Sequence, residues 1–242
     1  MVDLHTHILP GVDDGADNFH EATEMLDIAA SNGTTHIVLT PHYLTREHIF
    51  APLKKNDILS RFETFKEAAA QQYPGIKLYS GAELFAVNNI IDVIEDDQII
   101  PINGTKYVLT EFGFEDRLSR ATDVATTLTG HGYVPVLAHP ERYNFIQRNP
   151  RDIVRFLEMG CLIQINTTSL SGFSGRLAQD VALSFLENNL VTAVASDSHS
   201  MYHRVPNLSE AYAFVSSNFS DTYAEDIFYN NPLAIINGTP VY

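Results

Sequence analysis

The segment Asp3-Leu4-His5-Thr6-His7, together with the nearby Val12-Asp13-Asp14-Gly15, governs how the rest of this 242-residue sequence is interpreted. His5 and His7 are separated by one residue at the end of a short apolar run. Alternate side chains of a strand point to the same side, so such a pair can hold one metal ion from one direction. A His-x-His pair alone is weak evidence, and its interpretation depends on the residues at the ends of the other apolar runs.

Composition and charge restrict the classes of function. The 15 Lys and Arg against 30 Asp and Glu give a formal charge of −15, which argues against nucleic acid or anionic lipid as the main partner. No apolar stretch approaches the roughly 20 residues of a membrane span, and the N-terminus lacks a signal pattern. A single cysteine fits a reducing compartment. We therefore expect a cytoplasmic protein with no direct insertion into membranes.

Short apolar runs alternate with longer segments of helical apolar spacing. The predicted strands are Val2–Leu4, His36–Thr40, Lys77–Ser80, Lys106–Thr110, Val134–Ala138, Cys161–Ile165 and Thr192–Ala195. The predicted helices are Phe19–Ser31, Leu53–Gln72, Arg117–Thr129, Arg151–Met159 and Leu177–Asn189. Gly33, Gly132 and Gly160 follow three of these helices, where a left-handed residue is favoured. The alternation predicts a parallel α/β sheet with right-handed crossovers, closed or nearly closed into a barrel, in a single domain over residues 1–242.

Typical metal ligands follow six of the predicted strands. They are His5 and His7, His42, Glu83, Glu111, His139, and Asp197 with His199. In barrels of parallel strands the carboxyl ends converge on the active site. We therefore expect these side chains, although far apart in sequence, to surround one point.

These motifs resemble the polymerase and histidinol phosphatase (PHP) superfamily. They are the His-x-His pair, Pro41-His42, Gly81-Ala82-Glu83, His139-Pro140-Glu141-Arg142 and Ser196-Asp197-Ser198-His199. The Val12–Gly15, Leu109–Phe112 and His139–Tyr143 segments look like one branch, the manganese-dependent bacterial protein-tyrosine phosphatases of capsule and exopolysaccharide loci. Glu111 stands where many PHP members have histidine, which favours this branch over a histidinol phosphatase. The resemblance implies a distorted (β/α)7 TIM-like barrel of the PHP type.

The resemblance also implies the ligands of two or three divalent metal ions, with manganese as the branch's metal. His5, His7, Glu83 and Asp197 would hold the first ion, Glu83 would bridge to a second held by Glu111 and His139, and Asp14, His42 and His199 would hold a third. Mixed imidazole and carboxylate ligands suit Mn²⁺, Fe²⁺ or Zn²⁺, and the sequence does not choose among them.

Charge points to a phosphate ester as substrate. Four of the predicted ligands are carboxylates, which give −4 against the +6 of three divalent ions, and Arg142 and Arg204 add positive charge. Planar guanidinium groups bind a phosphate dianion through two parallel hydrogen bonds. We predict in-line attack by a metal-bridging hydroxide, with Arg142, Arg204, Asp14 and His199 as the catalytic residues. The resemblance implies a phosphotyrosine protein as substrate, namely a bacterial tyrosine kinase that regulates capsule or exopolysaccharide synthesis.

Three other functions remain open from the sequence. The same metals could serve a phosphatase or phosphodiesterase for a small metabolite, or the chain could be a non-catalytic metal-binding PHP module. An amidohydrolase is a further alternative, although Glu83 occupies the place of the bridging lysine that such enzymes usually have. Cysteine chemistry is disfavoured, because Thr167 stands six residues after Cys161, where cysteine phosphatases need arginine. Cys161 is predicted to be a structural residue.

Several aromatic and acidic positions have two interpretations. Phe85, Phe112 and Phe114 follow ligand positions and either line a pocket or belong to the core. Asp13 either shapes the turn beside Asp14 or reaches the site. Five histidines match no motif and are predicted to lie outside the site: His20, His36, His48, His131 and His203.

Overall fold

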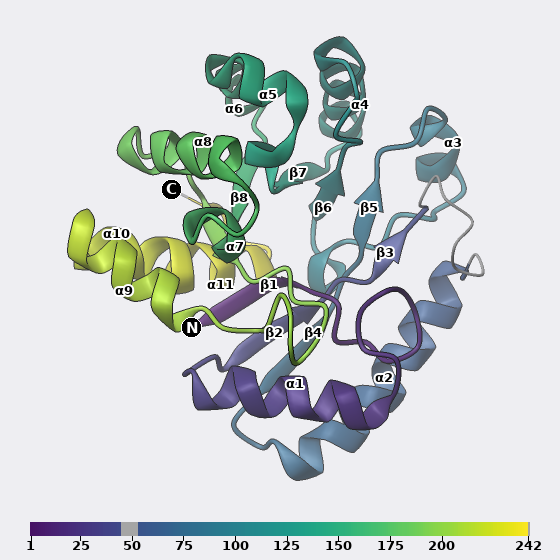
Figure 1. The fold of residues 1–242 in the computed structure, drawn as a ribbon. Coiled ribbons are helices and arrows are strands. Elements are labelled where there is room, and N and C mark those ends of the chain that lie inside the picture. The colour runs from purple at the N-terminus through teal and green to yellow at the C-terminus, as the bar shows by residue number, and fades with distance from the viewer. Residues whose placement is uncertain (45–52, 242) are drawn as a thin grey trace.

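Parallel strands form two sheets in this computed structural model, which describes residues 1–44 and 53–241 (Figure 1). The strands are β1 (Val2–Thr6), β2 (His36–Leu39), β3 (His42–Tyr43), β4 (Lys77–Ser80), β5 (Glu83–Phe85), β6 (Tyr107–Glu111), β7 (Val134–Ala138), β8 (Leu162–Asn166) and β9 (Ala193–Ala195). One sheet has the order β1-β2-β4 and the other the order β3-β5-β6-β7-β8-β9. Each pairing is parallel, as the alternation of strands and helices predicts.

The two sheets together make a distorted seven-stranded barrel. Pro41 lies between β2 and β3, and Gly81 lies between β4 and β5, so each pair is one strand broken by two residues. Proline cannot donate a ladder hydrogen bond, and glycine weakens a strand. The ring closes where Thr6 bridges to Ser198, and the His7 amide donates to the Ser198 carbonyl at 2.8 Å.

The helices pack around the strands (Figure 1). They are α1 (Phe19–Ser31), α2 (Lys55–Gln72), α3 (Ile90–Glu95), α4 (Leu118–Gly130), α5 (Asn144–Arg148), α6 (Ile153–Glu158), α7 (Thr167–Leu170), α8 (Arg176–Glu187), α9 (Ser209–Asn218), α10 (Asp221–Glu225) and α11 (Asn231–Ile236). Short turns of other types are η1 (Ile102–Gly104), η2 (Pro140–Arg142), η3 (Pro150–Asp152) and the π-helical η4 (Asp226–Asn230). No helix within the described ranges is both long and apolar enough to cross a bilayer.

The predicted strands and helices are confirmed, with every end within two residues of the prediction. The three predicted helix-ending glycines have φ between 82° and 85°, in the left-handed region. The sequence did not indicate the breaks that create β3 and β5, nor the helices α3, α5, α7 and α9 to α11.

Two apolar clusters hold the barrel and its helices together. The larger cluster packs the buried faces of α1, α2, α4 and α8 against one face of the strands. The smaller cluster contains alternate residues of β1, β6 and β7, together with Ile235 and Ile236 of α11. Alternate residues share one face of a strand, so α11 covers the strand face that the outer helices leave free.

Candidate metal centre

All nine predicted ligands lie together at the carboxyl ends of the strands. His5 is in β1, His42 begins β3, Glu83 begins β5, Glu111 ends β6, and His139 directly follows β7. The remaining four come from the loops after β1 and β9, namely His7, Asp14, Asp197 and His199. Their side-chain donors form overlapping groups in which the ligand atoms lie within 4.8 Å of one another.

Glu83 lies at the centre of these groups and is 1% exposed. Its Oε1 is 3.3 Å from His5 Nε2 and 3.1 Å from His139 Nε2. Its Oε2 is 2.8 Å from His42 Nδ1 and 3.5 Å from His7 Nε2. Each oxygen therefore faces a different pair of imidazoles, which is the geometry of a carboxylate that bridges two ions.

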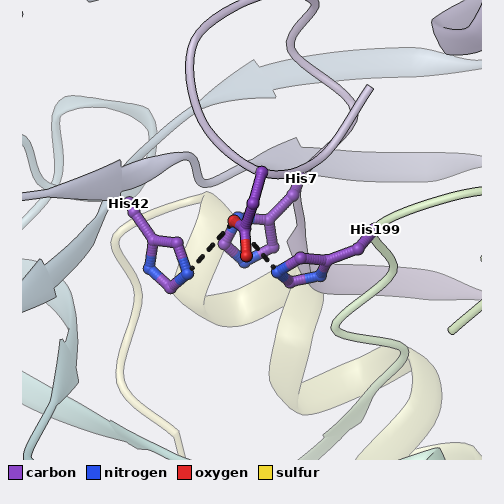
Figure 2. A group of neighbouring side chains, drawn as sticks. His7, His42 and His199 are labelled. Atoms are coloured by element: carbon purple, nitrogen blue, oxygen red, sulfur yellow. Dashed lines mark ion pairs between the residues drawn. The ribbon is translucent and has the colours of Figure 1, made fainter. Parts of the chain in front are cut away.

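Asp14 joins a second group with His7, His42 and His199 (Figure 2). One Asp14 oxygen is 3.5 Å from His42 Nε2 and 3.4 Å from His199 Nε2. Figure 2 shows the three labelled imidazoles around the same small space. The groups differ from the sets implied by resemblance in three respects. His7 also approaches Asp14, His42 and His199, His139 lies with His5 and Asp197, and Glu111 lies with His42 and Glu83.

The turn after β1 brings its carboxylates to the site because Gly15 allows the chain to fold back onto His7. A Cβ atom at Gly15 would lie 1.9 Å from the His7 carbonyl oxygen, so only glycine fits. The Ala16 amide donates to that same carbonyl at 3.0 Å. The Asp-Asp-Gly sequence is thus a structural requirement for the position of Asp14.

Asp13 both shapes the turn and supports the site. Its Oδ1 accepts from the Gly15 amide at 3.0 Å. Its Oδ2 lies 2.6 Å from His7 Nδ1 and accepts from the His42 amide at 2.8 Å. A carboxylate on the outer nitrogen of a histidine fixes the ring orientation and makes the other nitrogen a better metal ligand.

A chain of amide side chains from β8 supports the site and was not anticipated from the sequence. Gln164 Oε1 lies 3.0 Å from His5 Nδ1, and Gln164 Nε2 donates to Asn166 Oδ1 at 2.8 Å. Asn166 Nδ2 in turn donates to Asp197 Oδ2 at 2.7 Å. The chain joins two potential ligands through a strand that supplies none itself. The only sequence signal was an amide within the apolar run Leu162–Ile165 and a second amide directly after it.

Three residues of the site have left-handed backbone conformations. His139, Asp197 and Arg204 have φ of 35°, 50° and 54°, a region that residues with a side chain rarely adopt. Such a residue costs on the order of 1–3 kcal/mol and persists only where the surrounding structure imposes it. Strain of this kind clusters at functional sites, which agrees with the position of all three residues.

Burial and mutual charge perturb the ionisation of the cluster. Burial, and then the charge of Glu83, raises the pKa of Glu111 to about 8. Burial lowers the pKa of His139 to about 4. For Asp197 burial opposes ionisation, but His5, His7 and Arg204 together hold the pKa of the carboxyl well below its usual value. The site therefore mixes charged and neutral ligands within a few ångströms, a pattern typical of functional sites.

The donor set fits divalent cations. Within the described residues, no hydrogen bond of favourable geometry satisfies the buried atoms Glu83 Oε2, Asp197 Oδ1 and His199 Nε2, although Glu83 Oε2 lies 2.8 Å from His42 Nδ1. A buried polar atom without a partner costs free energy, and a bound ion would satisfy all three. Imidazole and carboxylate donors without thiolates suit Mn²⁺, Fe²⁺ or Zn²⁺.

Both predicted arginines reach the cluster and remain partly exposed. Arg204 Nη2 lies 2.5 Å from Asp197 Oδ2, and Arg142 Nη1 lies 3.6 Å from the same oxygen. The Arg142 guanidinium also stacks over the Phe114 ring at 4.8 Å. Phe114 is 39% exposed, whereas Phe85 and Phe112 are buried core residues. Phe114 is therefore the phenylalanine of the three that can contact a ligand at the site.

Cys161 and the remaining histidines of the described residues lie outside the cluster. Cys161 precedes β8, at the end of the strand opposite to Asn166, and burial raises the pKa of its thiol to about 12. A protonated, buried thiol is a poor nucleophile. Among the described residues, His20, His36, His131 and His203 join none of the ligand groups. His48 lies outside the described residues.

Comparison with known proteins identifies the family. The model of the family described as "Capsular polysaccharide synthesis, CpsB/CapC" matches residues 1–237. The chain belongs to the CpsB/CapC family. Tyrosine-protein phosphatase CpsB of Streptococcus agalactiae is 30% identical over 98% of both chains. Tyrosine-protein phosphatase YwqE of Bacillus subtilis is 30% identical over 99% of this chain and 93% of its own.

Solved structures agree with the fold and the family. A chain from the crystal structures of YwqE from Bacillus subtilis and CpsB from Streptococcus pneumoniae, described as unique metal-dependent tyrosine phosphatases, superposes with a TM-score of 0.91. It is 27% identical, and the match covers 100% of this chain and 96% of that one. The phosphotriesterase homology protein of Escherichia coli has a TM-score of 0.61 at 10% identity, which supports the barrel fold alone.

Proposed function

We propose that this chain is a metal-dependent protein-tyrosine phosphatase acting as a single domain over residues 1–242. The observation that carries the proposal is the convergence of nine imidazole and carboxylate side chains beside two partly exposed arginines. Members of its family are named tyrosine-protein phosphatases. The proposed substrate is a phosphorylated bacterial tyrosine kinase of capsule or exopolysaccharide synthesis. The proposed place of action is the cytoplasm, where kinases have access to ATP.

The proposed metal ligands are the nine side chains of the cluster, in the sets that the family resemblance implies. Glu83 would bridge two ions, with His5, His7 and Asp197 on one side and Glu111 and His139 on the other. Asp14, His42 and His199 would hold a third ion, and manganese is the proposed metal. Bound divalent ions would lower the pKa of a water molecule and stabilise negative charge on the phosphoryl oxygens.

The side chains of the protein bind and orient the ester. The Arg142 and Arg204 guanidinium groups bind the non-bridging phosphoryl oxygens and hold phosphorus in line with the attacking water. Burial opposes ionisation of Asp14, but His199 and His42 hold the pKa of its carboxyl below the usual range. Asp14 therefore accepts a hydrogen bond from the attacking water. The tyrosine leaving group, a phenol with pKa of about 10, departs with less need for protonation than an alkoxide would.

Two alternatives use the same residues differently. A small-metabolite phosphatase or phosphodiesterase would need a site closed around its substrate, whereas the Asp14 side chain at this site is about half exposed. A non-catalytic metal-binding module would have no need of two guanidinium groups placed for a phosphate.

A panel of phosphate esters tests the proposal. The Mn²⁺-loaded protein should hydrolyse a phosphotyrosine peptide with a higher kcat/KM than phosphoserine peptide, histidinol phosphate, sugar phosphates or bis(p-nitrophenyl) phosphate. A preference for a small metabolite or a diester would replace the proposed function with the first alternative, and no hydrolysis of any ester would favour the non-catalytic module.

A further inference from the structure

A cavity of about 430 Å³ lies beside the candidate metal centre. Its lining includes Leu170 of α7, Phe173, Tyr202, Arg204 and Phe214 of α9. This volume is within the range of binding pockets in proteins, which extends from roughly 300 to 1,000 Å³. Phe173 and Tyr202 are 71% and 76% exposed, the highest values for large apolar side chains among the described residues. Exposed apolar side chains that gather at one place mark interaction sites.

The cavity and the metal centre share a wall. Arg204 lines the cavity, yet its Nη2 lies 2.5 Å from Asp197 Oδ2 and its Nε donates to the Asp197 carbonyl at 3.1 Å. The carbonyl of Arg204 accepts from the His199 amide at 2.9 Å. One loop therefore carries potential metal ligands at its start and cavity residues at its end.

A second connection runs through β8. Asn166 at the end of β8 donates to Asp197, and α7, which directly follows Asn166, contributes Leu170 to the cavity. The Ser200 hydroxyl oxygen accepts from the amides of Tyr202 and His203, which fixes the turn that presents the Tyr202 side chain. The cavity is thus attached to the site from two sides rather than being a separate surface feature.

We propose that this cavity binds a large apolar or aromatic side chain of the substrate polypeptide that flanks the phosphotyrosine. This inference rests on the proposed function. A polypeptide with its phosphate beside Arg204 must leave the site along its walls, and the same arginine lines the cavity. The Glu210 carboxylate is also part of the lining. With the net charge of −15, it disfavours acidic flanking residues.

A set of synthetic peptides tests the inference on the full-length Mn²⁺-loaded protein. The reference is a phosphotyrosine peptide flanked by glycine and serine only. Six further peptides carry phenylalanine at one of the three positions on either side. Burial of a phenyl ring should raise kcat/KM about tenfold at one or two of these positions, chiefly through a lower KM. The Phe173→Ser/Tyr202→Ser double variant should reduce the gain to less than about twofold.

Val154→Ser, at an exposed apolar position of α6 outside the cavity, is the matched control and should keep the full gain. A gain that is absent at every position, or that survives in the double variant, would overturn the inference while leaving the proposed function intact. If the wild-type protein does not hydrolyse the glycine-flanked peptide either, the proposed function fails, and the inference fails with it.

Discussion

Replacement of Glu83 by glutamine perturbs the proposed site at its centre. The substitution keeps the shape of the side chain but removes its charge and replaces one oxygen with an NH₂ group, which does not bind a metal. The Glu83 carboxylate lies 3.1 to 3.5 Å from His5, His7 and His139, which are proposed ligands of both bridged ions. Both ions therefore lose the shared negative charge, and one of them also loses its oxygen ligand. Loss of a partner that only orients a ligand costs about 10- to 100-fold in metal affinity. Loss of a shared carboxylate should therefore cost about 100-fold or more per ion, or about 2.8 kcal/mol.

We expect Glu83→Gln to contain more than one ion fewer per chain than the wild type and to lose nearly all activity. Metal analysis after dialysis against buffer with limiting Mn²⁺, followed by turnover of a phosphotyrosine peptide, measures both quantities. Glu95→Gln, at the exposed end of α3, is the matched control and should behave as the wild type. A folded Glu83→Gln protein with the full complement of metal and normal turnover would refute the bridging role.

Three further predictions concern the arginines, the supporting carboxylate and the thiol. Arg142→Ala and Arg204→Ala should each raise KM and lower kcat with metal content unchanged. Lysine at either position should restore only part of the lost activity, because it lacks the planar guanidinium group that forms two parallel hydrogen bonds. Wild-type kinetics in both alanine variants would show that the two arginines do not bind the phosphate. Asp13→Asn should weaken metal binding about 10- to 100-fold, because it removes the negative charge beside His7 Nδ1 at 2.6 Å; an unchanged metal titration would contradict that role. Cys161→Ser should stay active, and iodoacetamide should not inactivate the wild-type protein at pH 8. With a thiol pKa of about 12, only about one Cys161 thiol in 10⁴ is ionised at that pH. An inactive but folded, metal-loaded Cys161→Ser variant, or a trapped phosphocysteine, would overturn the water-based mechanism.

The strands and their carboxyl ends were predictable because buried parallel strands are nearly continuous apolar runs, and potential ligands stand out where they interrupt or follow such a run. The residue that comes after each run therefore stands out, as Glu83 and His139 do. The breaks at Pro41 and Gly81 were less predictable, since both residues also occur in ordinary loops. The helices α9 to α11 were not predicted because each buries three residues or fewer, which is too few to establish a helical apolar period in the sequence.

Most of the residues that support the site could not be identified from the sequence. Gln164 and Asn166 act through hydrogen bonds to other side chains, and no spacing rule marks an amide for that purpose. The left-handed conformations of His139 and Asp197 are imposed by their surroundings. The sequence does not indicate them, because neither position is a glycine. Only the fold reveals that Asp13 contacts His7, because the contact depends on the close approach that Gly15 permits.

The dependence of phosphate release on bound metal is the sharpest test of the proposed chemistry. The purified protein is assayed on a phosphotyrosine peptide as isolated, after EDTA treatment and removal of the chelator, and after addition of Mn²⁺, Fe²⁺ or Zn²⁺. We predict that chelation abolishes phosphate release and that Mn²⁺ restores it, with two or three ions bound per chain at full activity. Phosphate release that persists in protein shown to be free of metal would contradict a metal-dependent mechanism.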